Sequence, residues 1–295
     1  MSGFSPDWLH LREPFDAAAR PTALVDELLL HVTRGTTEKP LEIVDLGAGA
    51  GSNLRYLAPQ LCGVQRWRLI DHDRPLLQAA LKTTHGWATA RGADVRKRWR
   101  ELTMMAPDFE CLVQCERCDL AGHPVTLPLA DIALPKGVLV TAAALLDLVS
   151  REWLDLLAAR CLDARATVCL ALSYDGRTTC TPAEPEDAEV LELFNRHQLG
   201  DKGFGAALGP GAATAAQKAF NTRGYQTKTL PSDWQIGPQY RAMQRALLDG
   251  WLGAARELAP KRHAALDAWH RRRCEHVAAG RSQLRVGHVD LIGWL

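Results

Sequence analysis

The chain has 295 residues, of which 47% are hydrophobic and 23% are charged, and its formal net charge is +1. This composition is ordinary for a soluble globular protein. A charge so close to zero gives no bulk argument for a nucleic-acid or a membrane-surface partner.

Targeting signals and cysteine usage bear on where the protein resides. The first residues show neither a basic nor an apolar leader region, so we expect no signal peptide. The longest nearly apolar run, residues 137–149, is too short to span a bilayer and contains Asp147. Eight cysteines without an export signal indicate reduced thiols, and we expect a cytoplasmic protein.

Short apolar runs alternate with helical stretches along the first 174 residues, a pattern that predicts an α/β domain with a mainly parallel sheet. Helices are expected over residues 5–34, with a break at Pro21. Strands and helices then follow in the order strand 41–47, strand 67–71, helix 75–91, strand 109–119, strand 137–143, a helix after Ser150 as N-cap, and strand 166–174.

A polar stretch rich in glycine and proline interrupts this rhythm at residues 175–215. A long insertion in a compact domain is usually functional or mobile. Within it, residues 186–196 are expected to form a helix. The chain then predicts a strand at 225–231, helices over 238–279 with a break near Pro260, and a last strand at 283–295.

The most informative stretch is the sequence IVDLGAGAG at residues 43–51, where a buried strand runs into a glycine-rich turn. Glycine is needed where the backbone turns tightly or approaches a ligand closely. Dinucleotide-binding enzymes use G-x-G-x-x-G at this place, but here the third glycine comes one residue early. Asp45, two residues before the first glycine, suits an ammonium group better than a pyrophosphate.

The run Asp45-Leu46-Gly47-x-Gly49-x-Gly51 resembles motif I of the class I S-adenosylmethionine (SAM)-dependent methyltransferases. The resemblance is strong over residues 41–174 and loose up to the end. It implies an α/β, Rossmann-like, doubly wound fold with a seven-stranded, mainly parallel sheet and helices on both faces. The single domain, 1–295, would comprise an N-terminal helical cap (1–40), a cofactor-binding core (41–174), a substrate-side insertion before the sixth strand (175–224), and closing strands and helices (225–295).

The resemblance also implies the residues that bind the cofactor SAM and its product S-adenosylhomocysteine. The family places an acid at the end of the second strand for the ribose hydroxyls, and another after the third strand near the adenine amine; Asp71 and Asp119 match these positions. Asp73 is either a second contact or a helix N-cap. A cation from the N-terminal helix, Arg20 or else Arg12, is expected at the SAM carboxylate. The implied cofactor set is Asp45, Gly47, Ala48, Gly49, Gly51, Asn53, Asp71, His72, Asp119, Leu120 and Arg20.

Catalytic groups are expected where the insertion follows the fifth strand. His197 is the candidate base, because its reference pKa lets it take a proton at neutral pH. Lys202 is a candidate partner for an anionic substrate group, and Asp201 can orient either neighbour. Asp147, just past the fourth strand, is either a catalytic or substrate-binding group or a helix cap. His288 is interpreted as a hydrogen-bonded interior histidine.

The function that follows is SAM-dependent methyl transfer to a small molecule, by in-line attack of a substrate nucleophile on the methyl group. A base is needed only if that nucleophile must lose a proton. The alternatives are an RNA methyltransferase and a non-catalytic or NAD-binding Rossmann-like protein. No RNA-binding module and no Asn-Pro-Pro-Tyr type motif follow the fourth strand, which argues against a nucleic-acid partner. We expect no membrane partner, and a monomer or a homodimer.

Three cysteines at 111, 115 and 118, followed by His123, raise the alternative of a metal or an iron–sulfur cluster. On a strand that rises about 3.3 Å per residue, Cys111 and Cys115 share a face about 13 Å apart while Cys118 points the other way. We therefore expect no metal site and interpret the cysteines as small apolar residues of a strand packed on both faces.

Overall fold

The structure, a computed structural model, describes residues 5–122 and 128–295. The strands are β1 (Leu41–Leu46), β2 (Gly63–Asp71), β3 (Asp94–Arg98), β4 (Glu101–Met105), β5 (Phe109–Arg117), β6 (Leu139–Ala143), β7 (Thr167–Thr181), β8 (Gln226–Pro231), β9 (Trp234–Ile236) and β10 (Gln283–Trp294). The α-helices are α1 (Pro6–Ala19), α2 (Thr22–His31), α3 (Ser52–Leu61), α4 (Arg74–Ala90), α5 (Arg151–Asp163), α6 (Asp187–Gln198), α7 (Ala212–Asn221), α8 (Arg241–Leu258) and α9 (His263–Ala278).

One mixed sheet organises the described residues, with the strand order β3-β4-β5-β2-β1-β6-β7-β10-β8 and with β9 paired to β10. The pairings among β5, β2, β1, β6 and β7 are parallel. β10 runs antiparallel to β7, β8 and β9, and the β3–β4 hairpin is antiparallel to β5. The prediction of seven mainly parallel strands is therefore wrong in number and in direction outside the central five.

The missed hairpin has a physical explanation. Strand β3 lies at the edge of the sheet, and its sequence, DVRKR, is charged and largely exposed. Only Val95 of this edge strand packs against the core, so β3 shows little of the alternation of apolar and polar residues by which a strand is identified. β4 does alternate, with Leu102 and Met104 buried, so the sequence carried a short signal for this strand that the prediction missed.

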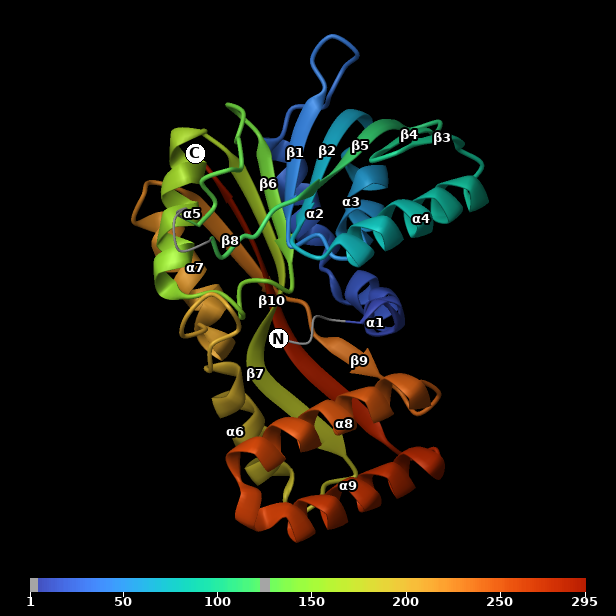
Figure 1. The fold of residues 1–295 in the computed structure, drawn as a ribbon, viewed down its shortest axis with the longest axis vertical. Helices are drawn as coiled ribbons and strands as arrows, with labels where there is room; N and C mark the ends of the chain where they lie inside the picture. The colour runs from blue at the N-terminus through green and yellow to red at the C-terminus, as the bar shows by residue number, and fades with distance from the viewer. Residues whose placement is uncertain (1–4, 123–127) are drawn as a thin grey trace.

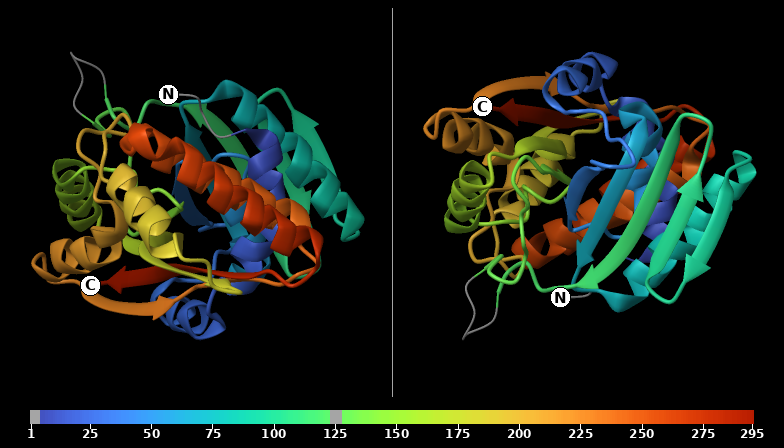
Figure 2. Two further views of the ribbon diagram at one scale, coloured as in Figure 1. Left: turned by 90° about the horizontal axis from the view of Figure 1, so that it is seen from below. Right: turned by 90° about the horizontal axis from the view of Figure 1, so that it is seen from above.

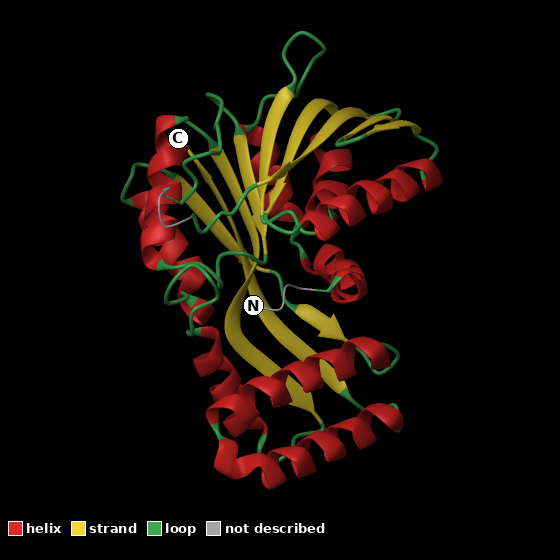
Figure 3. Ribbon diagram, viewed as in Figure 1, coloured by secondary structure: helices red, strands yellow, loops and turns green. Residues whose placement is uncertain are grey.

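Strands β7 and β10 are long and continue beyond the ends of their neighbours into a second lobe (Figure 1). There β9, α6, α8 and α9 pack around them (Figure 3). A separate hydrophobic cluster forms in this lobe and includes Trp234, Trp251 and Trp269. The prediction that the fifth strand ends at Tyr174 is wrong, because β7 continues to Thr181 as an antiparallel partner of β10. A bulge opposite Gly287 interrupts this pairing.

Helices cover the two faces of the sheet unequally. On one face α3 and α4 pack over β2, β5 and β4 while α2 packs over β10 and β8, and on the other α5 and α7 cover the strands from β6 to β8 (Figure 2). No helix of the described residues covers the second face of β2, β5 and β4. Polar pairs lie there instead, such as Arg68 with Glu116 at 2.7 Å and Gln114 with Glu101 at 2.7 Å. The expectation of helices on both faces therefore holds for the strands from β6 to β8 and fails for β2, β5 and β4.

The positions of Cys111, Cys115 and Cys118 reflect this difference between the two faces of the sheet. Cys111 and Cys115 both belong to the cluster beneath α3 and α4, whereas Cys118 lies beyond the end of β5 and packs against the opposite cluster. β5 is thus packed against helices on one face only, which corrects the prediction that both of its faces are packed. Among the described residues, no group of three or more His, Cys, Asp or Glu side chains could hold a metal ion. His123 lies outside the described residues.

Candidate functional site

The glycine-rich turn joins β1 to α3, and its backbone requires glycine. Gly47, Gly49 and Gly51 have φ angles of 64°, 51° and 78°, in the left-handed region that side chains disfavour. A Cβ atom on Gly49 would lie 3.2 Å from Leu9 of α1, and one on Gly47 would lie 3.2 Å from Leu145. The turn is therefore held between the N-terminal helix and the segment after β6, at the carboxyl end of the central strands (Figure 1).

Asp71, the last residue of β2, fixes the shape of this turn. Its Oδ2 accepts a hydrogen bond from the Gly49 amide at 2.9 Å, and its Oδ1 accepts one from the Asp73 amide at 2.9 Å. The side chain is largely buried. Asp73 is the N-cap of α4 and accepts from the Leu76 amide at 3.1 Å, so it takes the capping role that was one of its two predicted roles.

The segment after β5 lies beside the end of β2, because the Cys118 amide donates to the Asp71 carbonyl at 3.1 Å. Asp119 is exposed and accepts from the Ala121 amide at 3.0 Å, while the Leu120 side chain is buried. His72 is exposed on the preceding turn. The turns after β2 and β5 thus stand side by side, as the predicted nucleoside contacts require.

Asp45 is fully buried beneath the turn. Its Oδ1 accepts from the Asn53 side-chain amide at 2.8 Å, and its Oδ2 has no partner among the described residues. Burial raises the pKa of Asp45 to about 7, although Asn53 and the charge of Arg20 act in the opposite direction. A buried acceptor without a partner costs free energy that a ligand donor can recover.

Arg20 belongs to the same buried network, and each nitrogen of its guanidinium has a partner there. It donates to Asn53 Oδ1 at 2.7 Å and to Asp290 Oδ2 at 3.3 Å, contacts Cys169 Sγ at 3.6 Å, and stacks on the Tyr56 ring. Through these contacts Arg20 orients Asn53, which in turn holds Asp45, and its contact with a cofactor carboxylate stays a prediction.

Asp290 is the residue that sequence reasoning missed in this network. It lies in β10, accepts from Ser232 Oγ, and accepts from the Leu172 amide at 2.7 Å. Leu172 has a φ of 55°, a strained value for a residue with a large side chain. The only sequence signal was a carboxylate inside the otherwise apolar run HVDLIGWL.

A second polar group lies where the predicted catalytic residues meet. Lys202 Nζ lies 3.2 Å from His197 Nδ1, and His197 Nε2 lies 3.1 Å from Glu257 Oε2. Both ring nitrogens of His197 are engaged, so the ring accepts from Lys202 and donates to Glu257. His197 therefore holds Lys202 in place, and this arrangement does not favour it as the base.

Asp147 has the features of a base more clearly. Its Oδ1 is buried and has no partner among the described residues. Burial raises its pKa to about 6, while the nearby charges of Arg12 and Lys202 favour the carboxylate. Burial also lowers the pKa of Lys202, against the charges of Glu257 and Asp147.

The loop after α6 is built around this group. The Gly209 amide donates to the Asp147 carbonyl at 3.0 Å. Asp201 Oδ1 accepts from the amides of Gly203 at 2.6 Å and Gly205 at 3.0 Å. Asp201 thus closes a turn within its own loop, and the prediction that it orients His197 or Lys202 is wrong.

Arg12 connects α1 to the second lobe. It pairs with Asp16 at 2.9 Å and lies 5.0 Å from the Trp234 ring centroid, so it too has partners other than the predicted carboxylate. His288 packs against Trp234, and burial lowers its pKa to about 3. Its Nδ1 has no partner among the described residues, so the prediction of a hydrogen-bonded histidine is wrong for this ring atom.

Comparison with known proteins gives similarity at the level of solved structures alone. No family model matches the chain, and no curated protein matches it. A cyclopropane synthase from Mycobacterium tuberculosis is similar with a TM-score of 0.47 and 11% identity, over 98% of this chain and 94% of that one. A geranyl diphosphate C-methyltransferase from Streptomyces coelicolor A3(2) is similar with a TM-score of 0.44 and 10% identity, over 93% of this chain and 80% of that one. No helix of the described residues combines the length and the apolar character that crossing a membrane requires.

Proposed function

We propose that the chain is a class I SAM-dependent methyltransferase that acts on a small molecule. The observation that carries the proposal is the glycine turn with its two buried acids. Three glycines leave the backbone without side chains, Asp71 lies at the strand end beside Gly49, and Asp45 Oδ2 has no partner in the part of the chain that the structure describes.

These residues fit the chemistry of SAM. Because Gly47, Gly49 and Gly51 have no side chains, the methionine part of SAM could lie close to their backbone. The ammonium group of SAM could donate a hydrogen bond to Asp45 Oδ2. Asp71 would accept from the ribose hydroxyls. The adjoining turns, with His72, Asp119 and Leu120, would border the adenine. When bound, SAM supplies a methyl group already activated by its sulfonium.

The protein's own part is to align the substrate and to remove a proton where the nucleophile carries one. Asp147 Oδ1 would receive that proton, since a pKa of about 6 leaves it mostly ionised at neutral pH. Lys202, held by His197, would keep the carboxylate charged and can meet an anionic group of the substrate. A base whose accepting atom is buried suits a substrate small enough to be enclosed, which favours a small molecule over a nucleic acid.

Isothermal titration calorimetry with S-adenosylhomocysteine tests the proposal. Wild type should bind, and Asp71→Ala should weaken binding by at least about 1.5–3 kcal/mol, the contribution of each of the two charged hydrogen bonds to the ribose hydroxyls that it would remove. Glu116→Ala is the matched control, because this acid, near the end of the neighbouring strand, pairs with Arg68 on the open face of the sheet. Binding of NAD in place of S-adenosylhomocysteine, or equal affinity in both variants, would contradict the assignment.

A further inference from the structure

The β3–β4 hairpin presents an unusual surface next to α4. Trp99, in the turn between the two strands, is 79% exposed, the highest value among the large hydrophobic side chains of the described residues. Exposing an indole costs free energy that burial against a partner would recover. Its neighbours in sequence, Arg98 and Arg100, are also exposed.

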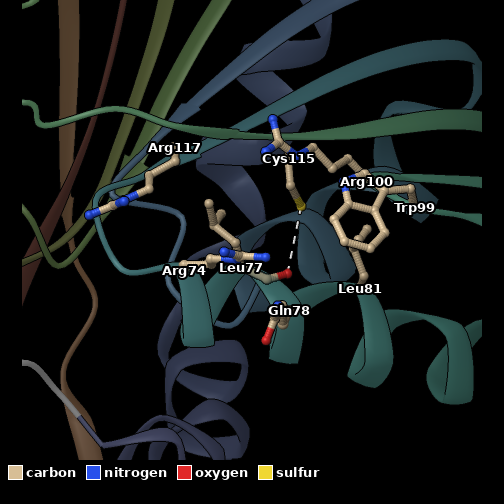
Figure 4. A pocket seen from close by; sticks show the side chains of 8 residues that line it. All are labelled: Arg74, Leu77, Gln78, Leu81, Trp99, Arg100, Cys115 and Arg117. Carbon is tan, nitrogen blue, oxygen red and sulfur yellow. Dashed lines mark hydrogen bonds between the residues drawn. The ribbon is translucent and has the colours of Figure 1, made fainter.

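A cavity of about 160 Å³ lies between this hairpin and α4 (Figure 4). Leu77 and Leu81 of α4 and Cys115 of β5 line it on the inside, and Trp99 lines it toward solvent. The Cys115 thiol contacts the Leu77 carbonyl at 3.7 Å, and burial raises its pKa to about 11, so this lining is uncharged. The inner part of the cavity is therefore apolar.

The rim of the cavity is positively charged. Three arginines line it, namely Arg74 at the start of α4, Arg100 in the hairpin and Arg117 at the end of β5, and no acidic residue of the ranges 5–122 and 128–295 does. Among the residues that the structure describes, none of these three guanidinium groups forms an ion pair with a carboxylate. Arg117 donates to the His72 carbonyl at 3.1 Å, which ties the rim to the turn that follows Asp71.

We propose that this cavity is a binding site for an aromatic anion, a planar ring that bears a phosphate, carboxylate or sulfonate group. The volume matches that of a single ring, since a cavity of about 150 Å³ can hold benzene. The ring would enter the apolar part beside the indole of Trp99, where stacking adds to burial. The anionic group would remain at the rim, where guanidinium groups bind oxyanions in a bidentate manner.

The site is separate from the candidate catalytic group, since it lies across β5 and α4 rather than at the turn after β6. A ligand of this site needs both the ring and the charge. The apolar lining alone would bind any small hydrocarbon, and the arginines alone would bind any polyanion. This double requirement distinguishes the proposal from general attraction of nucleic acid to a basic hairpin.

Calorimetric titration with phenyl phosphate, inorganic phosphate and benzylamine tests the requirement for both parts. Phenyl phosphate should bind one per chain, at least about tenfold more tightly than inorganic phosphate, which corresponds to about 1.4 kcal/mol. Benzylamine, with the same ring and the opposite charge, should not bind. Equal affinity for the two phosphates, or no binding of phenyl phosphate at millimolar concentration, would overturn the proposal.

Three variants locate the site, and a fourth is the control. Arg100→Gln and Trp99→Ala should each weaken phenyl phosphate binding about fivefold to tenfold, and Gln78→Glu should weaken it by placing an acid at the lining. Arg98→Gln changes the net charge as Arg100→Gln does but lies outside the cavity, so it should change affinity less than about twofold. Equal losses in the Arg98 and Arg100 variants would show a diffuse basic surface and refute the site.

Discussion

The unpartnered oxygen of Asp45 makes a quantitative prediction about protons. With a pKa of about 7, Asp45 is protonated in about nine molecules of ten at pH 6. An ammonium group bound against Oδ2 favours the ionised form, so its arrival must expel that proton. At pH 6 the amino group of S-adenosylhomocysteine is already charged and contributes little. We therefore expect about 0.9 proton to be released for each molecule bound to wild type.

Calorimetry in two buffers of different ionisation enthalpy measures this number, because released protons add the heat of buffer protonation. Asp45→Asn keeps the shape of the side chain and its proximity to Asn53 but has no proton to lose, so its binding enthalpy should not depend on the buffer. Wild-type affinity should rise about tenfold per pH unit below pH 7, and that of the variant should not. A wild-type enthalpy that is independent of the buffer at pH 6 would refute the contact.

Further predictions concern the buried network, the base and stability. Arg20→Met should lower the free energy of unfolding by about 3–5 kcal/mol in urea titrations, because it leaves Asp290 buried without its ion partner. A loss below about 1 kcal/mol, together with abolished cofactor binding, would show instead that Arg20 binds the cofactor. Asp147→Asn should abolish turnover yet leave S-adenosylhomocysteine affinity unchanged, and the wild-type rate should fall below pH 6. Lys202→Met should lower turnover more than His197→Gln does, as steady-state kinetics would show; the reverse order would restore the histidine as base. Burial raises the pKa of Asp45 above its value in the unfolded chain, so its protonated form stabilises the fold. This contribution to the free energy of unfolding is complete below about pH 4 and is lost as the pH rises through 7. In Asp45→Asn the urea midpoint should therefore depend less on pH over this range.

The central strands were predictable because their physics is local. β1 and β6 are short apolar runs, and β2 and β5 alternate buried apolar residues with polar ones, so each of these strands stands out from the helices between them. Capping is local as well, and the predicted N-cap Ser150 accepts from the Trp153 amide at 3.2 Å. His197 and Lys202 were both singled out as polar residues at one helix end, but the contact between them, at 3.2 Å, was not predicted.

The rest depended on contacts distant in sequence. Nothing near Tyr174 shows that β7 continues, because the stretch that follows gains its strand conformation from pairing with β10, more than a hundred residues later. The partners of Arg20 were equally out of reach, since Asp290 lies 270 residues away. Burial of Asp147 and Asp45 is a property of packing, so their raised pKa values could not be anticipated from spacing.

The position of β10 in the sheet has a consequence for the making of the protein. This strand is the last of the described elements in sequence, yet it lies inside the sheet between β7 and β8 and extends through both lobes. Until it leaves the ribosome, β7 can pair only with β6, along its first residues, and β8 and β9 have no strand to join. Neither lobe of a nascent chain can therefore complete its sheet before β10 has been synthesised. A chain truncated before Gln283 should not fold into a smaller stable protein, and quality-control proteases should degrade it.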